Sequence, residues 1–241
     1  MTSSPIEDYG LIGDGLTAAL VCRNGSIDWL CWPRFDSDAC FAALLGTEEH
    51  GRWLIAPTDN LVQSSRRYQT DTLILETDFE TAGGSVRLID FMPIGVGASS
   101  VVRLVVGLRG SVTMHVDLRL RFDFGRMAPW VERRADGFVA KIGPDLVALS
   151  APVTVSASHS RATADFVVTV GQQLPFVLSY GASNAPEPVR LDVGKALKTT
   201  QSDGIEWIGR FDKPTLWPDG CAPLLVDASG VFLRGAPAGQ P

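Results

Sequence analysis

The stretch that decides the fold is Val112-Thr113-Met114-His115-Val116-Asp117-Leu118-Arg119-Leu120-Arg121-Phe122. Its even-numbered residues from Met114 to Phe122 are apolar, and the residues between them are polar. Side chains of a β-strand point alternately to its two faces, so this period of two predicts a strand with one buried face and one face in water. The segment therefore indicates a sheet packed on one side.

Segments of the same kind lie on both sides of this stretch. They are short runs rich in β-branched and aromatic residues, each bounded by Gly, Pro, Asn or Asp, and they predict strands at 18–22, 26–31, 51–56, 71–80, 86–91, 100–109, 112–124, 137–142, 146–150, 153–158, 163–170 and 174–180. The pair Asn24-Gly25 predicts a type I′ hairpin turn. The repeated helical crossovers that parallel strands need are missing between the predicted strands. The sequence therefore predicts an all-β fold, a large antiparallel β-sandwich with one or two short helices.

Two segments break the strand pattern. Residues 38–45 predict a short helix, with Ser37 or Asp38 as its N-cap and Gly46 at its end. From 192 to 210 the apolar spacing becomes helical, and after it prolines and glycines interrupt every further pattern. We expect the tail at 221–241 to form no core and to be disordered.

Composition excludes several classes of protein. The chain has 241 residues, of which 45% are hydrophobic and 20% charged, as in globular proteins. Its 21 Lys and Arg against 27 Asp and Glu give a net charge of −6 without a basic cluster, so we expect no nucleic-acid partner. No apolar run approaches the roughly 20 residues of a bilayer span, and the N-terminus lacks the features of a signal peptide. These features predict no membrane association and a cytoplasmic location.

The cysteines are Cys22, Cys31, Cys40 and Cys221. Their spacing fits neither a paired zinc knuckle nor a C-x-x-C redox motif, so we expect no metal and no cofactor. In the cytoplasm they are predicted to be reduced and mostly buried thiols.

Several motifs carry a family resemblance. The N-terminal ones are Pro5-Ile6-Glu7-Asp8-Tyr9-Gly10-Leu11-Ile12-Gly13-Asp14-Gly15 and Asn24-Gly25-Ser26-Ile27-Asp28-Trp29-Leu30-Cys31-Trp32-Pro33-Arg34-Phe35-Asp36-Ser37. Later ones are Tyr68-Gln69-Thr70-Asp71-Thr72-Leu73, Arg87-Leu88-Ile89-Asp90-Phe91-Met92-Pro93, Phe124-Gly125-Arg126 with Pro129-Trp130, and Gly143-Pro144-Asp145. Taken in order over about residues 5–218, the chain resembles the N-terminal part of bacterial glucoamylase-like and trehalase-like hydrolases of glycoside hydrolase family 15.

The resemblance implies a supersandwich-like N-terminal domain that precedes an (α/α)6 barrel. In that family two glutamates of the barrel act as general acid and general base, and inverting enzymes hold such a pair roughly 6.5–9.5 Å apart. The roughly 30 residues after Arg210 cannot form such a barrel. We therefore expect a sandwich domain at 1–200, the start of a linker at 201–220 and a tail unlike the family at 221–241. The change of pattern at Cys221 favours a disrupted reading frame over a simple truncation.

The function implied is that of a non-catalytic domain of an α-glucosidic hydrolase, of glucoamylase or trehalase type. Such a domain would support a catalytic barrel, its partner, and whether it also rims the active site is open. The chain alone is expected to be inactive. The alternative is a free-standing carbohydrate-binding or protein-interaction module.

The segment 28–37 is the candidate site. Two tryptophans, a proline, an arginine and two aspartates in ten residues suit stacking on a sugar ring or packing on a neighbouring domain. Three interpretations stay open: the tryptophans fill the core beside a local Arg34–Asp36 ion pair, the loop docks on the barrel, or it contacts an α-glucan or trehalose. The residues assigned to this substrate-contact or domain-docking loop are Asp28, Trp29, Trp32, Arg34, Phe35 and Asp36. In the docking version Trp32 and Phe35 are exposed.

No residue is assigned a catalytic role, because no pair of candidates has a diagnostic spacing. The groups considered are the carboxylates and imidazoles of Asp28, Asp36, Asp38, Glu76, Asp78, Asp90, His50, His115 and His159. Asp90 is expected to form a turn at a strand end, His115 to lie on the surface, and Trp130 to anchor its loop.

Overall fold

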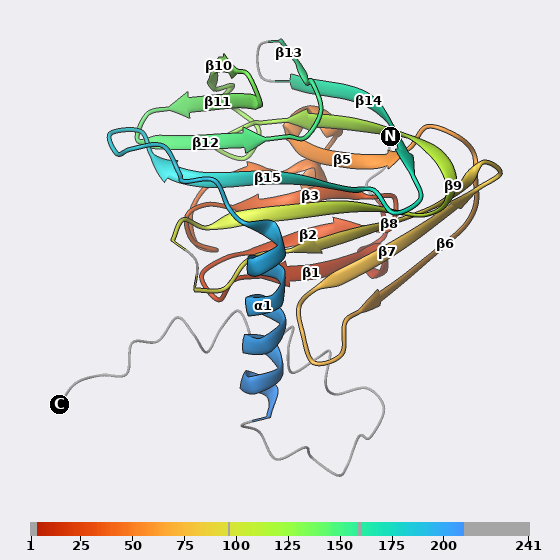
Figure 1. Cartoon of the computed structure of the whole chain (residues 1–241). Coiled ribbons are helices and arrows are strands. Elements are labelled where there is room, and N and C mark those ends of the chain that lie inside the picture. The colour runs from red at the N-terminus through yellow and green to blue at the C-terminus, as the bar shows by residue number, and fades with distance from the viewer. Residues whose placement is uncertain (1–3, 96, 159–160, 210–241) are drawn as a thin grey trace.

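The computed structural model describes residues 4–95, 97–158 and 161–209 (Figure 1). Within these ranges the chain forms 15 strands, all paired antiparallel, which confirms the all-β fold. The strands are β1 (Tyr9–Gly13), β2 (Ala18–Cys22), β3 (Ser26–Cys31), β4 (Ala39–Phe41), β5 (Arg52–Pro57), β6 (Leu61–Tyr68), β7 (Leu75–Thr81), β8 (Gly84–Phe91), β9 (Ser100–Arg119), β10 (Trp130–Arg134), β11 (Gly137–Ile142), β12 (Asp145–Ser150), β13 (Ser156–Ser158), β14 (Arg161–Thr169) and β15 (Gln173–Ala182). Helical segments are the 3₁₀ turns η1 (Ile6–Asp8), η2 (Ala43–Leu45) and η3 (Glu48–His50) and the helix α1 (Val193–Ile208).

The strands form two layers that share β9. The first layer runs β1-β2-β3-β5-β9-β14, and the second runs β6-β7-β8-β9-β15-β12-β11-β10. Residues 100–110 of β9 pair with β8 and β15, whereas residues 111–119 pair with β5 and β14. Gly110 lies at the change of partner with φ +62°, and a Cβ there would lie 2.2 Å from the carbonyl oxygen of Gly83. The strands predicted at 100–109 and 112–124 are therefore one strand that passes between layers at a glycine.

The core lies between the two layers. Val112, Met114, Val116 and Leu118 of β9 are each at most 1% exposed, so the predicted apolar face is confirmed. The opposite face is not fully in water, because Asp117 and Arg119 on it are also buried. They belong to one apolar cluster with residues of the second layer such as Phe176.

One buried arginine links the layers. Arg103 on β9 is fully buried and donates to Oδ1 of Asp90 on β8 at 2.8 Å. The same guanidinium donates across the core to the carbonyl of Gly25 at 2.7 Å and to that of Trp53. The expectation that Asp90 forms a strand-end turn is wrong, because its side chain is the buried partner of this arginine.

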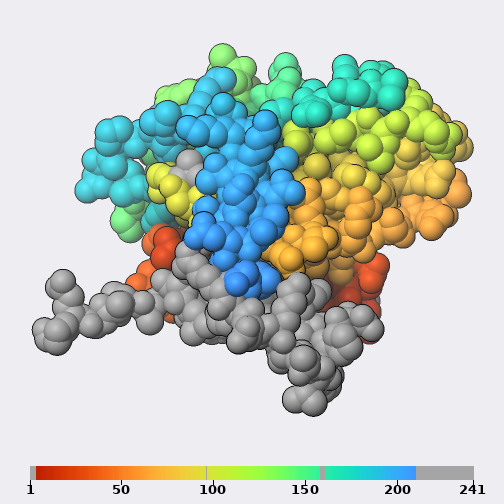
Figure 2. All heavy atoms as spheres, turned by 60° about the horizontal axis from the view of Figure 1, so that its bottom comes forward, coloured from red at the N-terminus to blue at the C-terminus, as the bar shows by residue number. Residues whose placement is uncertain are grey.

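The helix α1 covers the outer face of the second layer, where Figure 1 shows it crossing the strands and Figure 2 shows it against the yellow and orange atoms beneath it. Asp192 caps its N-terminus by accepting from the backbone N–H of Lys195 at 3.0 Å. Ala196 packs on a small apolar cluster that includes Phe91 and Val102. The helical spacing predicted from residue 192 onward is confirmed.

Two local predictions are wrong. Residues 38–46 form strand β4 followed by the 3₁₀ turn η2, because pairing of Phe41 with Leu30 of β3 buries this segment as a strand. The turn at Asn24-Gly25 is also not type I′, since only Gly25 has a positive φ, of +85°. A Cβ on Gly25 would lie 2.3 Å from the carbonyl oxygen of Ile55, so the close approach to β5 also requires glycine.

The strands that sequence analysis missed are β1, β4, β6 and β10. β6 and β10 are mostly exposed and lack an apolar face, so no alternation marks them. The expected tail at 221–241 lies outside the described residues, and the division into 1–200 and 201–220 stays a prediction. Among the helices of the described ranges, none has the length and apolarity to cross a bilayer.

Candidate functional site

Asp28, the first candidate of the 28–37 segment, is a structural residue of β3. Its carboxylate is buried and accepts hydrogen bonds from Tyr9 Oη at 2.7 Å and from the Ser26 hydroxyl. Burial raises the pKa of Tyr9, and the hydrogen bond to Asp28 raises it further, so the phenol remains a donor. This pair ties β1 to β3 across β2.

Trp32 follows directly after β3 and points into the core. It is 4% exposed, and its Nε1–H donates to Ser99 Oγ at 3.0 Å. Ser99 Oγ in turn donates to Asp14 Oδ2 at 2.6 Å, and the Trp32 ring lies 6.0 Å from that of Tyr180. The expectation of an exposed Trp32 on a docking surface is therefore wrong, because the indole fills the sandwich and its N–H is satisfied there.

The tip of the segment is exposed. Arg34 Nε lies 2.9 Å from Asp36 Oδ1, and its hydrogen bond lowers the pKa of the Asp36 carboxyl. Phe35 is 49% exposed, and its backbone N–H donates to the carbonyl of Leu16, which is 56% exposed. The structure thus separates a buried base at Trp32 from an exposed tip at Arg34, Phe35 and Asp36, for which the docking and sugar-contact interpretations stay predictions.

Trp29 is half-buried on the outer face of the first layer. Its ring lies 6.2 Å from that of Phe124, and it packs against a small cluster that includes Cys31 and Ala39. Burial, with smaller contributions from Asp38 and Asp36, raises the pKa of the Cys31 thiol to about 11. Cys31 is therefore protonated at neutral pH and is no nucleophile.

The other thiols follow the sequence prediction. Within the described ranges the cysteines Cys22, Cys31 and Cys40 are buried and unpaired, and Cys221 lies outside those ranges.

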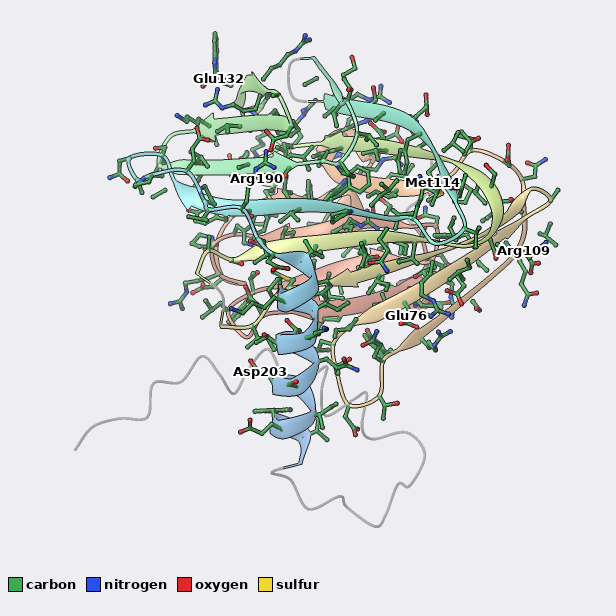
Figure 3. The ribbon with its side chains drawn as sticks, viewed as in Figure 1. Glu76, Arg109, Met114, Glu132, Arg190 and Asp203 are labelled. Atoms are coloured by element: carbon green, nitrogen blue, oxygen red, sulfur yellow. The ribbon has the colours of Figure 1, made fainter. Side chains whose placement is uncertain are left out.

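The carboxylates of β7 form ion pairs on the second layer, with Glu76 labelled in Figure 3. Glu76 lies 2.5 Å from Arg67, and Asp78 lies 2.6 Å from Arg87. The hydrogen bond from Arg87 lowers the pKa of Asp78. A general acid in glycoside hydrolysis needs a raised pKa, so Asp78 does not fit that role.

Asp90 has a raised pKa but no access to a substrate. Burial raises the pKa of its carboxyl, and Arg103 only partly opposes this. The side chain is 0% exposed. In the part of the chain that the structure describes, we find no pair of carboxylates arranged for acid–base hydrolysis.

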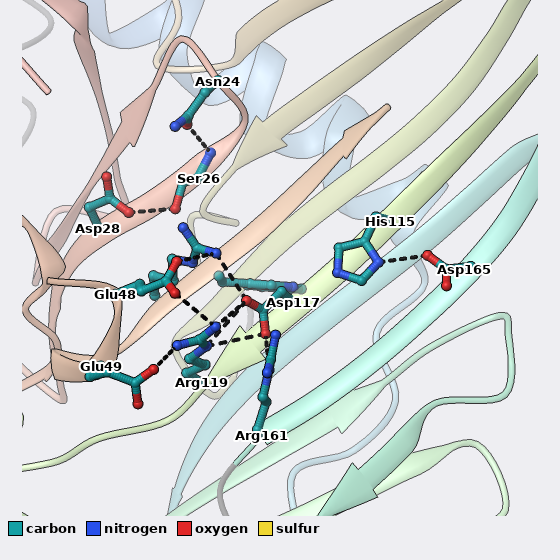
Figure 4. A network of polar contacts seen from close by, with 12 residues as sticks. Asn24, Ser26, Asp28, Glu48, Glu49, His115, Asp117, Arg119, Arg161 and Asp165 are labelled. Carbon is teal, nitrogen blue, oxygen red and sulfur yellow. Dashed lines mark hydrogen bonds and ion pairs between the residues drawn. The ribbon is translucent and has the colours of Figure 1, made fainter. Parts of the chain in front are cut away.

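A network that sequence analysis did not single out surrounds Asp117 (Figure 4). Asp117 on β9 is 1% exposed and accepts from Arg161 at 2.7 Å and from Arg52 at 3.0 Å. Burial raises the pKa of Asp117, but hydrogen bonds from Arg161, Arg52 and Arg119 outweigh it and bring the pKa to about 2. His115, Asp117 and Arg119 lie on one face of β9, and the charges of Asp117 and Arg119 on that face could have indicated this network from the sequence.

The described histidines have local partners. His115 Nδ1 lies 2.6 Å from Asp165 on the same outer face, partly exposed as predicted. His50 Nδ1 accepts from the backbone N–H of Thr47 at 3.1 Å, and His159 lies outside the described residues. No group of three or more His, Cys, Asp or Glu side chains suited to a metal occurs in the described ranges.

Trp130 does not anchor its loop, so that expectation is wrong. It begins the edge strand β10 and is 79% exposed, more than any other large hydrophobic of the described residues except Val189.

The fold has a counterpart among solved structures. The chain is similar to a bacterial glucoamylase complexed with acarbose, with a TM-score of 0.61 and 13% identity, over 88% of this chain and 38% of that one. This likeness defines the class, a two-layer antiparallel sandwich of the kind found in that glucoamylase. The family model "Trehalase-like, N-terminal" matches residues 1–194, and the chain belongs to this family.

Sequence relatives point the same way. Trehalase 1 of Sulfolobus acidocaldarius is 32% identical over 195 residues, which cover 80% of this chain and 31% of that protein. A trehalase of Thermoplasma volcanium is 30% identical over 65% of this chain and 26% of its own length, and one of Mycolicibacterium smegmatis is 27% identical over 96% and 38%. The chain therefore spans only about a third of the length of these trehalases.

Proposed function

We propose that the chain is the non-catalytic N-terminal domain of a trehalase-type or glucoamylase-type hydrolase of glycoside hydrolase family 15, and that it supports a catalytic (α/α)6 barrel. The observation that carries this proposal is the family match over residues 1–194, combined with a span of only about a third of the related trehalases. The remaining two thirds of such proteins would supply the barrel and its two glutamates.

The engagement of the carboxylates supports the non-catalytic role. Glu76, Asp78, Asp90 and Asp117 each lie in an ion pair with arginine. The pKa values of Asp78 and Asp117 are lowered and Asp90 is fully buried, so none of these three fits a general acid that protonates a glycosidic oxygen.

We place the docking surface for the barrel at the tip of the β3–β4 loop. Leu16 and Phe35 are both exposed there, and their backbones are joined by a hydrogen bond. Gly13 and Gly15 of the neighbouring β1–β2 turn line a small hollow together with Gly204 and Trp207 of α1. The C-terminal part of α1 thus lies beside the turn that carries Leu16, the residue hydrogen-bonded to Phe35.

Complementation tests this proposal. We would produce the 241-residue chain together with the part of Trehalase 1 of S. acidocaldarius that lies beyond its matched region, and measure their association and trehalose hydrolysis. The expected result is a complex with at least tenfold more activity than the trehalase fragment alone, which Phe35→Asp weakens.

The matched control is Val170→Asp, at an exposed position in the turn between β14 and β15. This variant should associate like the unchanged chain. Absence of any complex, or equal loss in both variants, would contradict the proposed docking surface.

A further inference from the structure

A hollow of about 420 Å³ lies on the outer face of the second layer, beside α1. Its floor is a row of small outward side chains, since Val139 pairs with Ala148 and Ala148 pairs with Ser179 across β11, β12 and β15. The volume falls in the range of small-molecule sites. Because the side chains of the floor are small, they leave room for a ligand above the sheet.

The segment 187–191 forms one wall of this hollow. It returns over β15 so closely that a Cβ on Gly181 would lie 3.2 Å from Pro188 Cγ. From it Glu187 reaches Arg134 at 2.7 Å, and Arg190 pairs with Asp136; Figure 3 shows Arg190 over the sheet. Both pairs are partly exposed and contribute little to stability, so a ligand could replace them.

An exposed aromatic ring lies on the same face of the sheet, beyond the residues that line the hollow. On β10 the residues Trp130, Glu132 and Arg134 point outward, whereas Val131 packs against the core. Pairing of Glu132 with Val139 places Glu132 next to the floor. Trp130 precedes Glu132 by two residues, so it lies about 7 Å away along the strand. The ring is 79% exposed, so most of its surface is open to a ligand.

We infer that this hollow binds an α-linked glucan chain, with one glucose ring stacked on Trp130. A pyranose presents a face of C–H groups that packs on an indole, and a rim of hydroxyls that both donate and accept hydrogen bonds. Arg134 and Glu187 on the rim of the hollow offer donors and acceptors to the chain, and Glu132 lies between this rim and Trp130. The choice of an α-glucan rests on the proposed function, whereas the location rests on the hollow and the exposed tryptophan.

Calorimetry on the full 241-residue chain tests the inference, with maltoheptaose as the probe and xylohexaose as the comparison sugar. We expect maltoheptaose to bind and xylohexaose not to bind. Trp130→Ala should weaken the affinity at least tenfold, Trp130→Phe should retain most of it, and Ala148→Phe should abolish binding by filling the floor. Unchanged thermal unfolding in each variant would show that the fold is intact.

The matched control is Phe124→Ala, which removes another exposed aromatic ring, in the turn after β9. It should bind maltoheptaose like the unchanged chain. Loss of binding in Phe124→Ala but not in Trp130→Ala, or no maltoheptaose binding at millimolar concentration, would overturn the inference. Equal binding of xylohexaose would overturn the choice of an α-glucan. If the chain still forms a complex with the trehalase fragment, these failures leave the proposed function standing.

Discussion

Asp90 and Asp117 are both at most 1% exposed, yet their pKa values shift in opposite directions. Asp90 lies in the apolar core with one arginine, so the cost of burial dominates and raises its pKa. Asp117 lies at the outer face of the first layer, where three arginines donate to it and lower its pKa to about 2. The comparison teaches that the number of donors, and not burial alone, decides the ionisation of these carboxylates.

The largest expected effect comes from breaking the core pair. Arg103→Met leaves Asp90 buried without its arginine and removes the donor to the carbonyls of Gly25 and Trp53. We expect the free energy of unfolding to fall by about 3–5 kcal/mol, measured by urea denaturation. The double variant Asp90→Asn with Arg103→Met should recover part of this loss. A loss below about 1 kcal/mol in Arg103→Met would contradict the stabilising role of the Arg103–Asp90 pair.

Trp32 is a third buried polar group, since its N–H donates to the Ser99 hydroxyl, which donates to the Asp14 carboxylate. Because its indole is buried and its N–H is satisfied by Ser99, Trp32→Ser should cost about 3–5 kcal/mol of stability. Phe35→Ser, at an exposed position three residues along, should change stability by less than about 1 kcal/mol. Similar losses of stability in Trp32→Ser and Phe35→Ser, measured by thermal and urea unfolding, would contradict a loop with a buried Trp32 and an exposed Phe35.

The smallest effect is the pH dependence of the Asp117 network. The folded pKa of Asp117, about 2, lies below the ordinary aspartate pKa of 3.8. The stability that its ionised form contributes is therefore fully present above the unfolded pKa and is lost as pH falls through about 2. The contribution at neutral pH is about 2 kcal/mol. Asp117→Asn should therefore lower stability at pH 7 and flatten its decline in acid.

Asp90 provides the opposite sign in the same experiment. Its folded pKa is raised, so the stability linked to its protonation is present below the unfolded pKa and is lost as pH rises through the folded pKa. Urea unfolding between pH 2 and 7 should show that Asp90→Asn removes a slope of opposite sign. If Asp90→Asn and Asp117→Asn changed the pH dependence of stability in the same direction, the opposite pKa shifts of the two carboxylates would be contradicted.

The sequence predicted the fold well where one strand face is apolar. The period of two at Met114, Val116 and Leu118 predicted a buried face, and the structure confirms it. The period could not show that β9 changes partners at Gly110, because alternation records burial and not pairing. Residues 38–46 failed because helix-like composition was overridden by pairing of Phe41 with β3.

The candidate site was only partly predictable. The composition of 28–37 indicated a candidate loop, whose role stays a prediction. Two tryptophans three residues apart look alike in sequence, and only packing shows that Trp32 is buried and Trp29 half-buried. The hollow on the second layer was not foreseen, because its floor joins Ala148 of β12 to Ser179 of β15, with β13 and β14 between them in the chain. Long-range pairing of this kind leaves no local pattern.

Hydrolysis by the purified chain tests the proposed non-catalytic role most directly. We would incubate the 241-residue chain with trehalose, maltose and starch, and measure released glucose against buffer and against an intact trehalase. We expect no release above buffer, because Glu76, Asp78, Asp90 and Asp117 are each paired with arginine and the two glutamates of the family would lie in the barrel. Turnover that survives repurification and disappears when one carboxylate of this chain is substituted would contradict that role.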